Sequence, residues 1–172
     1  MPTYGTIKRS YPRGVVLRGY DPNEPKTLTQ AFPVKDGVVV KSGQTISLAW
    51  SATNSQYEWV LGATAPATPY IALEDSTDED VIEAGKLPAL SCAGQFEIQT
   101  PYYNATGAYI VDTPLTYDGV TGSVKAAGAG DPVVGFVTRI HGPVSLKGHN
   151  SSAVNLNVII FSTGFKAAAP TA

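Results

Sequence analysis

The sequence has little of the chemistry on which most enzymes and metal proteins rely. Its 172 residues include one cysteine, one methionine and two histidines, so an internal disulfide is excluded. Charged residues make up only 15% of the chain, against a usual share of about a quarter. The net charge of −2 is too small to indicate nucleic acid or an anionic membrane as a partner.

Long apolar runs are also missing. Residues 1–20 have no continuous apolar core of the kind that a signal peptide needs. No stretch approaches the roughly 18 apolar residues that cross a bilayer. We therefore expect a soluble protein, made in a reducing cytoplasm, with no membrane partner.

The few reactive residues match no catalytic or metal-binding pattern. Cys92 lies in an apolar run with no basic neighbour, which predicts a buried and inert thiol. His141 and His149 share an expected loop over residues 140–151, where solvated histidines are the favoured interpretation. Their spacing fits neither a zinc signature nor a Gly-x-Ser-x-Gly elbow. The sequence thus predicts a protein that is not an enzyme and that uses no cofactor or metal.

Short β segments separated by turns dominate the chain. Alternation over residues 44–50 places Ile46, Leu48 and Trp50 on one face of a strand, and such alternation favours burial of Trp50 and Trp59. A short helical turn is expected near the acidic residues, over 76–84. Many short strands predict an all-β single domain, a β-sandwich or a β-barrel. The expected strands cover 28–34 and 37–41, joined by a tight turn at 35–37, and then 44–50, 57–61, 70–73, 95–100, 109–111, 131–140 and 154–161.

Composition divides the chain into an extended basic arm and linker (residues 1–25), a β domain (26–165) and a flexible tail (166–172). The first 20 residues contain no acid, and glycine and proline interrupt any regular element. Two interpretations stand side by side: an arm that becomes ordered on a partner, and a frayed terminus or edge strand over 14–18. The candidate partner-binding residues of this arm are Tyr4, Lys8, Arg9, Tyr11, Arg13, Arg18 and Tyr20.

Six of the fourteen acidic residues fall within ten positions between two expected strands. Because strands flank this run, we expect it to form an acidic surface patch on the folded body. The Asp-x-Asp-x-Asp-Gly order of a helix-loop-helix calcium site is absent. The candidate patch residues are Glu74, Asp75, Asp78, Glu79, Asp80 and Glu83.

Three segments around this run carry a family resemblance. They are Pro69-Tyr-Ile-Ala-Leu-Glu-Asp-Ser-Thr-Asp-Glu-Asp-Val81, Ala84-Gly-Lys-Leu-Pro-Ala-Leu90 and Gly94-Gln-Phe-Glu-Ile-Gln-Thr100. Together with motifs at 112–116, 121–124 and 130–137, they make residues 62–137 resemble the capsid decoration, or cement, proteins of tailed bacteriophages.

The resemblance implies a structural virion protein, made in the host cytoplasm and located on the outer surface of the capsid. Its partners would be the major capsid protein and itself, as homotrimers at three-fold and quasi-three-fold positions that strengthen the head against DNA pressure. The basic arm would then bind the capsid. An alternative is a head-fibre or tail β module that binds host carbohydrate, which predicts Trp50 or Trp59 outside the core. A hydrolase would need His141 or His149 against a carboxylate in a cleft.

Overall fold

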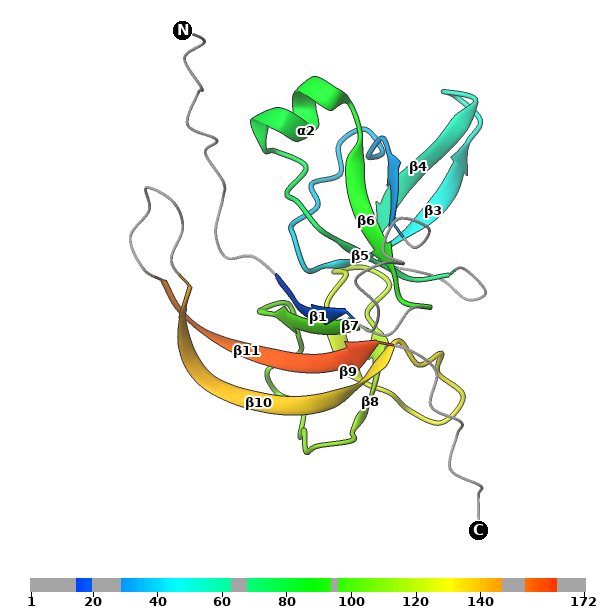
Figure 1. Cartoon of the computed structure of the whole chain (residues 1–172). Helices are drawn as coiled ribbons and strands as arrows, with labels where there is room; N and C mark the ends of the chain where they lie inside the picture. Colours follow the sequence, from blue (N-terminus) through cyan, green and yellow to red (C-terminus); the bar gives the residue numbers. More distant parts are fainter. Residues whose placement is uncertain (1–14, 20–28, 63–67, 94–95, 147–153, 164–172) are drawn as a thin grey trace, which may run out of the picture.

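The computed structural model describes residues 15–19, 29–62, 68–93, 96–146 and 154–163. Within those residues the chain forms eleven strands and one short helix. The strands make two antiparallel sheets, one above the other in Figure 1. The prediction of an all-β fold is therefore confirmed, and the two packed sheets make it a β-sandwich.

The six-stranded sheet has the order β1-β7-β11-β10-β8-β9. Its strand β7, next to the edge strand β1, alternates as expected, with Phe96, Ile98 and Thr100 all buried. The chain reaches this sheet first with β1 at one edge and returns to it after completing the other sheet. The bounds are β1 Val15–Gly19, β7 Phe96–Thr100, β8 Pro114–Tyr117, β9 Val124–Ala126, β10 Gly135–Leu146 and β11 Val154–Thr163.

The five-stranded sheet, in the order β2-β6-β5-β3-β4, curls until its two edges meet. The Trp59 N–H donates to Pro33 O at 2.8 Å, and the Lys35 N–H donates to Trp59 O at 3.0 Å. These bonds join the segment after β2 to the opposite edge strand, β4. The bounds are β2 Thr29–Phe32, β3 Thr45–Ser51, β4 Gln56–Leu61, β5 Tyr70–Ala72 and β6 Leu87–Ser91.

Two apolar clusters result, because β5 and β6 are buried on both faces. Ile71 and Leu90 face the six-stranded sheet, where they pack with residues such as Phe161 in an inter-sheet core. Ala72 and Leu87 face the other way, into an inner core within the curled sheet. Strands buried on both sides lose the polar alternation that marks a half-exposed strand, which explains why the sequence gives no clear signal for β6.

A short helix, α2 (Glu79–Ala84), covers the inner core by burying Val81. The predicted helical turn is therefore confirmed. Gly85 ends the helix with φ of 66°, and its N–H donates to Val81 O, as glycine does at helix C-termini. Asp78 occupies the N-cap position but makes no side-chain capping bond.

The predicted strand over residues 37–41 is wrong. A turn closes with the Val38 N–H donating to Lys35 O, as expected, but the chain then crosses to the loop before α2 instead of returning along β2. The Val40 N–H donates to Ser76 Oγ, and the Ser76 N–H donates to Val40 O. The expected strand over 109–111 is also absent, because Ile110 enters a turn and donates its N–H to Thr113 Oγ1.

Hydrogen bonds between strand ends and loops join the two sheets at one end of the sandwich. The Thr45 N–H donates to Gly122 O at 2.7 Å, and Thr100 Oγ1 donates to Gly43 O at 2.9 Å. Gly122 has φ of 66°, and a Cβ built there would lie 2.7 Å from Thr45 O. The close approach of the sheets at this point therefore requires glycine for two reasons, its backbone angle and its lack of a side chain.

We expect Gly122→Ala to destabilise the protein strongly. Gly130→Ala is the matched control, because Gly130 also has positive φ (84°) but has open space where a Cβ would stand. Both variants bear the cost of alanine at positive φ, about 1–2 kcal/mol. Only Gly122→Ala must also push the sheets apart, so its urea midpoint should fall clearly further. Equal losses in the two variants would show that the sheets do not meet closely at Gly122.

Candidate functional site

The candidate arm residues divide between one described strand and the part of the chain outside the described residues. Arg18 lies in β1, which pairs antiparallel with β7 and places Arg18 opposite Glu97. The edge-strand interpretation is therefore confirmed over Val15–Gly19. Tyr4, Lys8, Arg9, Tyr11, Arg13 and Tyr20 lie outside the described residues.

Glu97 is a charged centre on the six-stranded sheet. Its Oε1 accepts a hydrogen bond from the Arg139 guanidinium at 2.8 Å and one from Thr138 Oγ1 at 3.3 Å. The register adds a second arginine position, Arg18, on the neighbouring strand. This register places one basic position of the candidate arm within the sheet, on the strand beside Glu97.

The acidic surface patch is smaller than expected. Glu79, Asp80 and Glu83 are exposed on α2, and Glu74 is half-buried. Asp75 and Asp78 are 0% and 2% exposed, so the surface assignment is wrong for these two residues. Figure 1 shows α2 at the outer side of the five-stranded sheet, on the far side from β10 and β11.

Asp75 is buried because it satisfies the backbone of a neighbouring loop. Its Oδ1 accepts the Ser42 N–H at 2.7 Å, and its Oδ2 pairs with Lys41 Nζ at 3.2 Å. A buried carboxylate needs such partners. The Asp75 carboxylate also affects Tyr102. Burial of the Tyr102 hydroxyl is the main cause that raises its pKa to about 12, and the negative charge of Asp75 adds to this. Asp75, in the loop between β5 and α2, is therefore a structural anchor for the neighbouring loop at Lys41 and Ser42.

The two tryptophans have opposite environments. Trp59 is fully buried and donates its indole N–H to Leu87 O at 2.8 Å. Trp50 is 59% exposed, so the prediction that it is buried is wrong. The alternation correctly places Ile46, Leu48 and Trp50 on one face, but β3 runs past the end of the inner core before it reaches Trp50.

An aromatic pair is the most distinctive exposed feature of the described surface. Trp50 lies directly opposite Tyr57 in the β3–β4 ladder. Tyr57 is 51% exposed, and the two rings meet edge to face with centroids 5.2 Å apart. Tyr57 was not among the residues expected at a site. Tyr57 and Trp59 are two positions apart in β4 and therefore share a face, which the strand register makes the Trp50 face.

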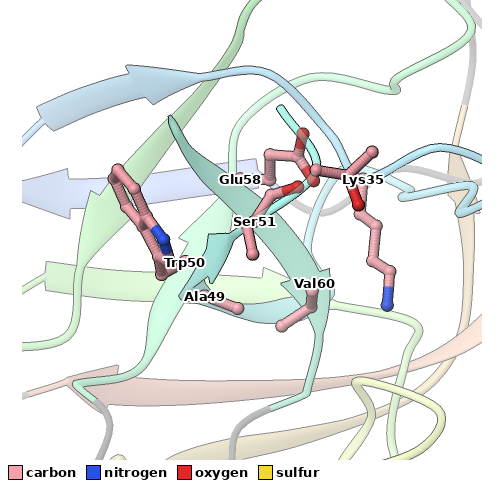
Figure 2. A pocket seen from close by; sticks show the side chains of 8 residues that line it. Lys35, Ala49, Trp50, Ser51, Glu58 and Val60 are labelled. Carbon is pink, nitrogen blue, oxygen red and sulfur yellow. The ribbon is translucent and has the colours of Figure 1, made fainter. Parts of the chain in front are cut away.

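A buried carboxylate lies on the other face of this hairpin. Glu58 accepts hydrogen bonds from Asn54 Nδ2 at 2.6 Å and Gln56 Nε2 at 3.3 Å. The bond from Asn54 is the main cause that holds the pKa of Glu58 below its ordinary value. Figure 2 shows Glu58, Ser51 and Lys35 together, with the Trp50 ring on the opposite side of the strand. Glu58 and its neighbours border a surface pocket at this end of the hairpin. The residues that line it are Lys35, Ala49, Trp50, Ser51, Ala52, Thr53, Glu58 and Val60.

The arrangement gives the hairpin a carboxylate side and an aromatic side, and Trp50 also lines the pocket beside Glu58. Glu58 organises the β3–β4 turn, since it accepts hydrogen bonds from Asn54 in that turn and from Gln56 at the start of β4. The Trp50–Tyr57 pair links β3 to β4 by its ring contact and also offers apolar ring area to solvent. Aromatic groups of this kind bind saccharide rings or protein side chains, and the pair is therefore the candidate binding site among the described residues.

The remaining reactive residues take positions away from this site. Cys92 is buried, and burial raises the pKa of its thiol to about 12, which confirms the prediction of an inert thiol. His141 lies within β10, so the expected loop over 140–151 is wrong as far as Leu146. A register shift between His141 and Val144 lets Gly142 and Pro143 remain in the strand. His149 lies outside the described residues.

Two further findings apply to the described part of the chain. It holds no group of three or more His, Cys, Asp or Glu residues arranged to bind a metal ion. Its one helix, α2, is far too short to span a membrane.

Comparison with known proteins adds no relative. No protein-family model matches the chain, and no curated protein is significantly similar to it in sequence.

Proposed function

We propose that this chain is a structural virion protein that binds the outer surface of an assembled phage capsid and has no catalytic role. It would act as trimers at three-fold and quasi-three-fold positions, with the major capsid protein as its partner. The motifs at 69–81, 84–90 and 94–100 support this proposal through their resemblance to decoration proteins. The β-sandwich is compatible with it, because the fold supplies a body from which binding segments extend.

The observation that carries the proposal is the pairing of β1 with β7 at the edge of the six-stranded sheet. This pairing fixes the chain from Val15 onward at the edge of the sheet, and residues 1–14 precede it in the sequence. They contain three cationic residues and no acid. A basic segment anchored at one end loses less entropy on binding an acidic surface than a free peptide would.

Charge separation supports the same proposal. The exposed carboxylates of α2, Glu79, Asp80 and Glu83, belong to the five-stranded sheet's side of the body. The cations of the arm precede β1 in the sequence, and β1 lies at the edge of the other sheet. A basic segment and an acidic helix in one chain would favour a single orientation on a charged surface.

The stabilising effect would follow from linkage. A ligand that binds the expanded shell and not its precursor shifts the equilibrium toward the expanded shell. Three arms on one trimer would add avidity, because the second and third contacts form at a high effective concentration. Neither effect requires a catalytic group.

The test is binding to expanded phage heads assembled without this protein, followed by sedimentation and electron microscopy. Full-length protein should bind, with density at the three-fold positions. A variant that lacks residues 1–14 keeps β1 and should fold normally but bind at least about tenfold more weakly, because interface energy concentrates in aromatic and arginine residues. A variant that lacks residues 166–172 is the matched control and should bind like the full chain.

Two results would contradict the proposal in different ways. No binding of the full chain to heads would remove the capsid role altogether. Equal binding by the full chain and the variant without residues 1–14 would remove the arm as the clamp and leave the body as the contact.

The Trp50–Tyr57 pair favours a second candidate function, binding of host carbohydrate by a head-fibre or tail module. An exposed tryptophan outside the core is what that alternative expects, and Trp50 is 59% exposed. Sugar rings pack their apolar faces against such aromatic surfaces, while hydroxyl groups remain available to polar neighbours.

Host cell-wall polysaccharide should then change the fluorescence of Trp50. Because Trp59 is buried, collisional quenching by iodide reports mainly on Trp50, and bound saccharide should reduce that quenching. Trp50→Phe should abolish the response, whereas Val39→Ala, at a 52% exposed apolar position elsewhere, should leave it unchanged. If the polysaccharide protects neither the wild-type chain nor the control, the aromatic pair does not bind carbohydrate.

A further inference from the structure

A small cavity lies at the edge of the six-stranded sheet, where residues 102–104 run alongside the last strand, β9. The Asn104 N–H donates to Val124 O at 2.9 Å, and the Val124 N–H donates to Tyr102 O at 3.0 Å. The turn between β8 and β9 contributes the other wall. The cavity has a volume of about 260 Å³ and shares no lining residue with the pocket beside Glu58.

The apolar part of the lining is held in place by the core of the protein. It consists of Val124, which is fully buried, and Tyr103, which packs against the inter-sheet core. The Tyr103 ring meets the Tyr109 ring edge to face, with centroids 5.8 Å apart. Tyr109 Oη in turn donates to Asn104 O at 2.7 Å. The cavity therefore has a preformed aromatic wall, which needs little ordering when a ligand binds.

Asp118 gives the cavity a charged acceptor. Its Oδ1 accepts the Thr121 N–H at 2.8 Å and the Val120 N–H at 2.9 Å. The bond from Thr121, followed by that from Val120, holds the pKa of Asp118 below its ordinary value. The carboxylate is therefore ionised and oriented by the turn. A carboxylate has about four acceptor positions, so Asp118 can still accept a hydrogen bond from a ligand.

Lys125, Ser123 and Asn104 bring donors to the same cavity. Lys125 is half-buried, and among the described residues it forms no ion pair with Asp118 or any other carboxylate. Asn104 Oδ1 accepts the Thr106 N–H at 3.1 Å and Thr106 Oγ1 at 2.7 Å, which fixes the amide by its oxygen end. Its Nδ2 group and the Lys125 ammonium group can therefore donate to a ligand.

This lining determines the class of ligand that the cavity can take. Asp118 and Lys125 carry opposite charges, so a neutral ligand is favoured over a cation or an anion. Hydroxyl groups both donate and accept, and can therefore use the carboxylate and the donors together. An apolar C–H face can pack against the Tyr103 ring. The volume is below the roughly 300–1,000 Å³ of sites for drug-sized ligands, which suits one sugar ring.

We propose that the cavity between residues 102–104 and the β8–β9 turn binds one sugar ring of a glycan. Asp118 accepts a hydrogen bond from one hydroxyl group, Lys125 and Asn104 donate to others, and the ring lies against Tyr103. This site goes beyond the proposed function, because it needs neither a capsid nor the arm. It is also distinct from the Trp50–Tyr57 pair, which lies on the other sheet.

The test is a titration of the ¹⁵N-labelled full chain with the methyl glycosides of glucose, galactose and N-acetylglucosamine, followed by the NMR shifts of the backbone amides. At least one glycoside should cause saturable shifts with a millimolar dissociation constant. The shifts should centre on the amides of Asn104, Ser123 and Lys125.

Lys125→Met keeps the apolar stem of the side chain and removes its charged donor. It should weaken binding by about tenfold, because a hydrogen bond from a charged group is lost. Lys86→Met is the matched control, since Lys86 is exposed and lies outside the cavity, between α2 and β6. Its affinity should change by less than about twofold.

Tyr103→Leu tests the aromatic wall separately. It keeps an apolar side chain but removes the ring face, and should weaken binding by about fivefold. Its amide spectrum shows whether the β8–β9 turn keeps its structure. If this variant fails to fold, Lys125→Met still decides the question, because Lys125 is only half-buried.

Four results would overturn the inference. One is the absence of saturable shifts with all three glycosides up to about 50 mM, and another is a Lys125→Met variant that binds like the wild type. A third is displacement of the glycoside by glycine, which would show that the charges of Asp118 and Lys125 select a zwitterion. Shifts confined to Trp50 and Tyr57 would overturn it too, while supporting the carbohydrate alternative. None of these results depends on binding to phage heads, so the inference and the proposed function can fail separately.

Discussion

The structure depends on one short stretch of backbone, residues 41–45, which makes hydrogen bonds to both sheets. The Gly43 N–H donates to Ala72 O in the five-stranded sheet, while Gly43 O accepts from Thr100 of the six-stranded sheet. Thr45 also bonds to both sides. Its carbonyl oxygen accepts the Gly62 N–H, next to β4 of the five-stranded sheet, and its own N–H donates to Gly122 O, between β8 and β9 of the six-stranded sheet. Buried backbone groups must find such partners. The relative position of the two sheets is therefore set by this stretch as well as by the inter-sheet core.

This joint explains why an acidic residue from a charged run lies inside the protein. The Ser42 N–H is buried, and Asp75 Oδ1 accepts its hydrogen bond at 2.7 Å. Loss of a buried acceptor leaves its donor unsatisfied, a cost of about 1–3 kcal/mol. The acidic run thus contributes both to the stability of the joint, through Asp75, and to the surface charge of α2, through Glu79, Asp80 and Glu83.

A body held in this way keeps its described surface features at fixed positions. The edge strand β1 is paired with β7, the Trp50–Tyr57 pair lies at the end of β3 and β4, and the exposed carboxylates of α2 lie on the five-stranded sheet's side. β3 and β4 also contribute Ile46 and Trp59 to the inner core. Motion of the aromatic pair relative to that core would therefore require the two strands to separate.

The sequence predicted the parts of the fold in which one face of a strand is buried and the other is not. Alternation located β3, β4, β7 and β11, and the short helix was expected close to Glu79–Ala84. The strand β6 was missed because it is buried on both faces, and the strand expected over 37–41 was wrong because Val40 bonds to Ser76, 36 residues away.

Predictions about the candidate site had similar limits. Alternation gives the face on which Trp50 lies but not where the core ends, so its exposure could not be predicted. Asp75 resembles its acidic neighbours in sequence, and only the folded loops reveal that it accepts the Ser42 N–H. Tyr57 became visible as a partner of Trp50 only through the strand register. In each case the deciding contact joins residues that no local pattern relates.

Native-state hydrogen exchange tests the central claim, that residues 41–45 join the two sheets into one cooperative unit. The amides of Gly43 and Thr45 should exchange only through global unfolding, with the same opening free energy and the same dependence on denaturant as the amide of Phe161 in β11. Exchange of Gly43 and Thr45 through a smaller opening that leaves Phe161 protected would contradict the claim, because the sheets would then separate without the protein unfolding.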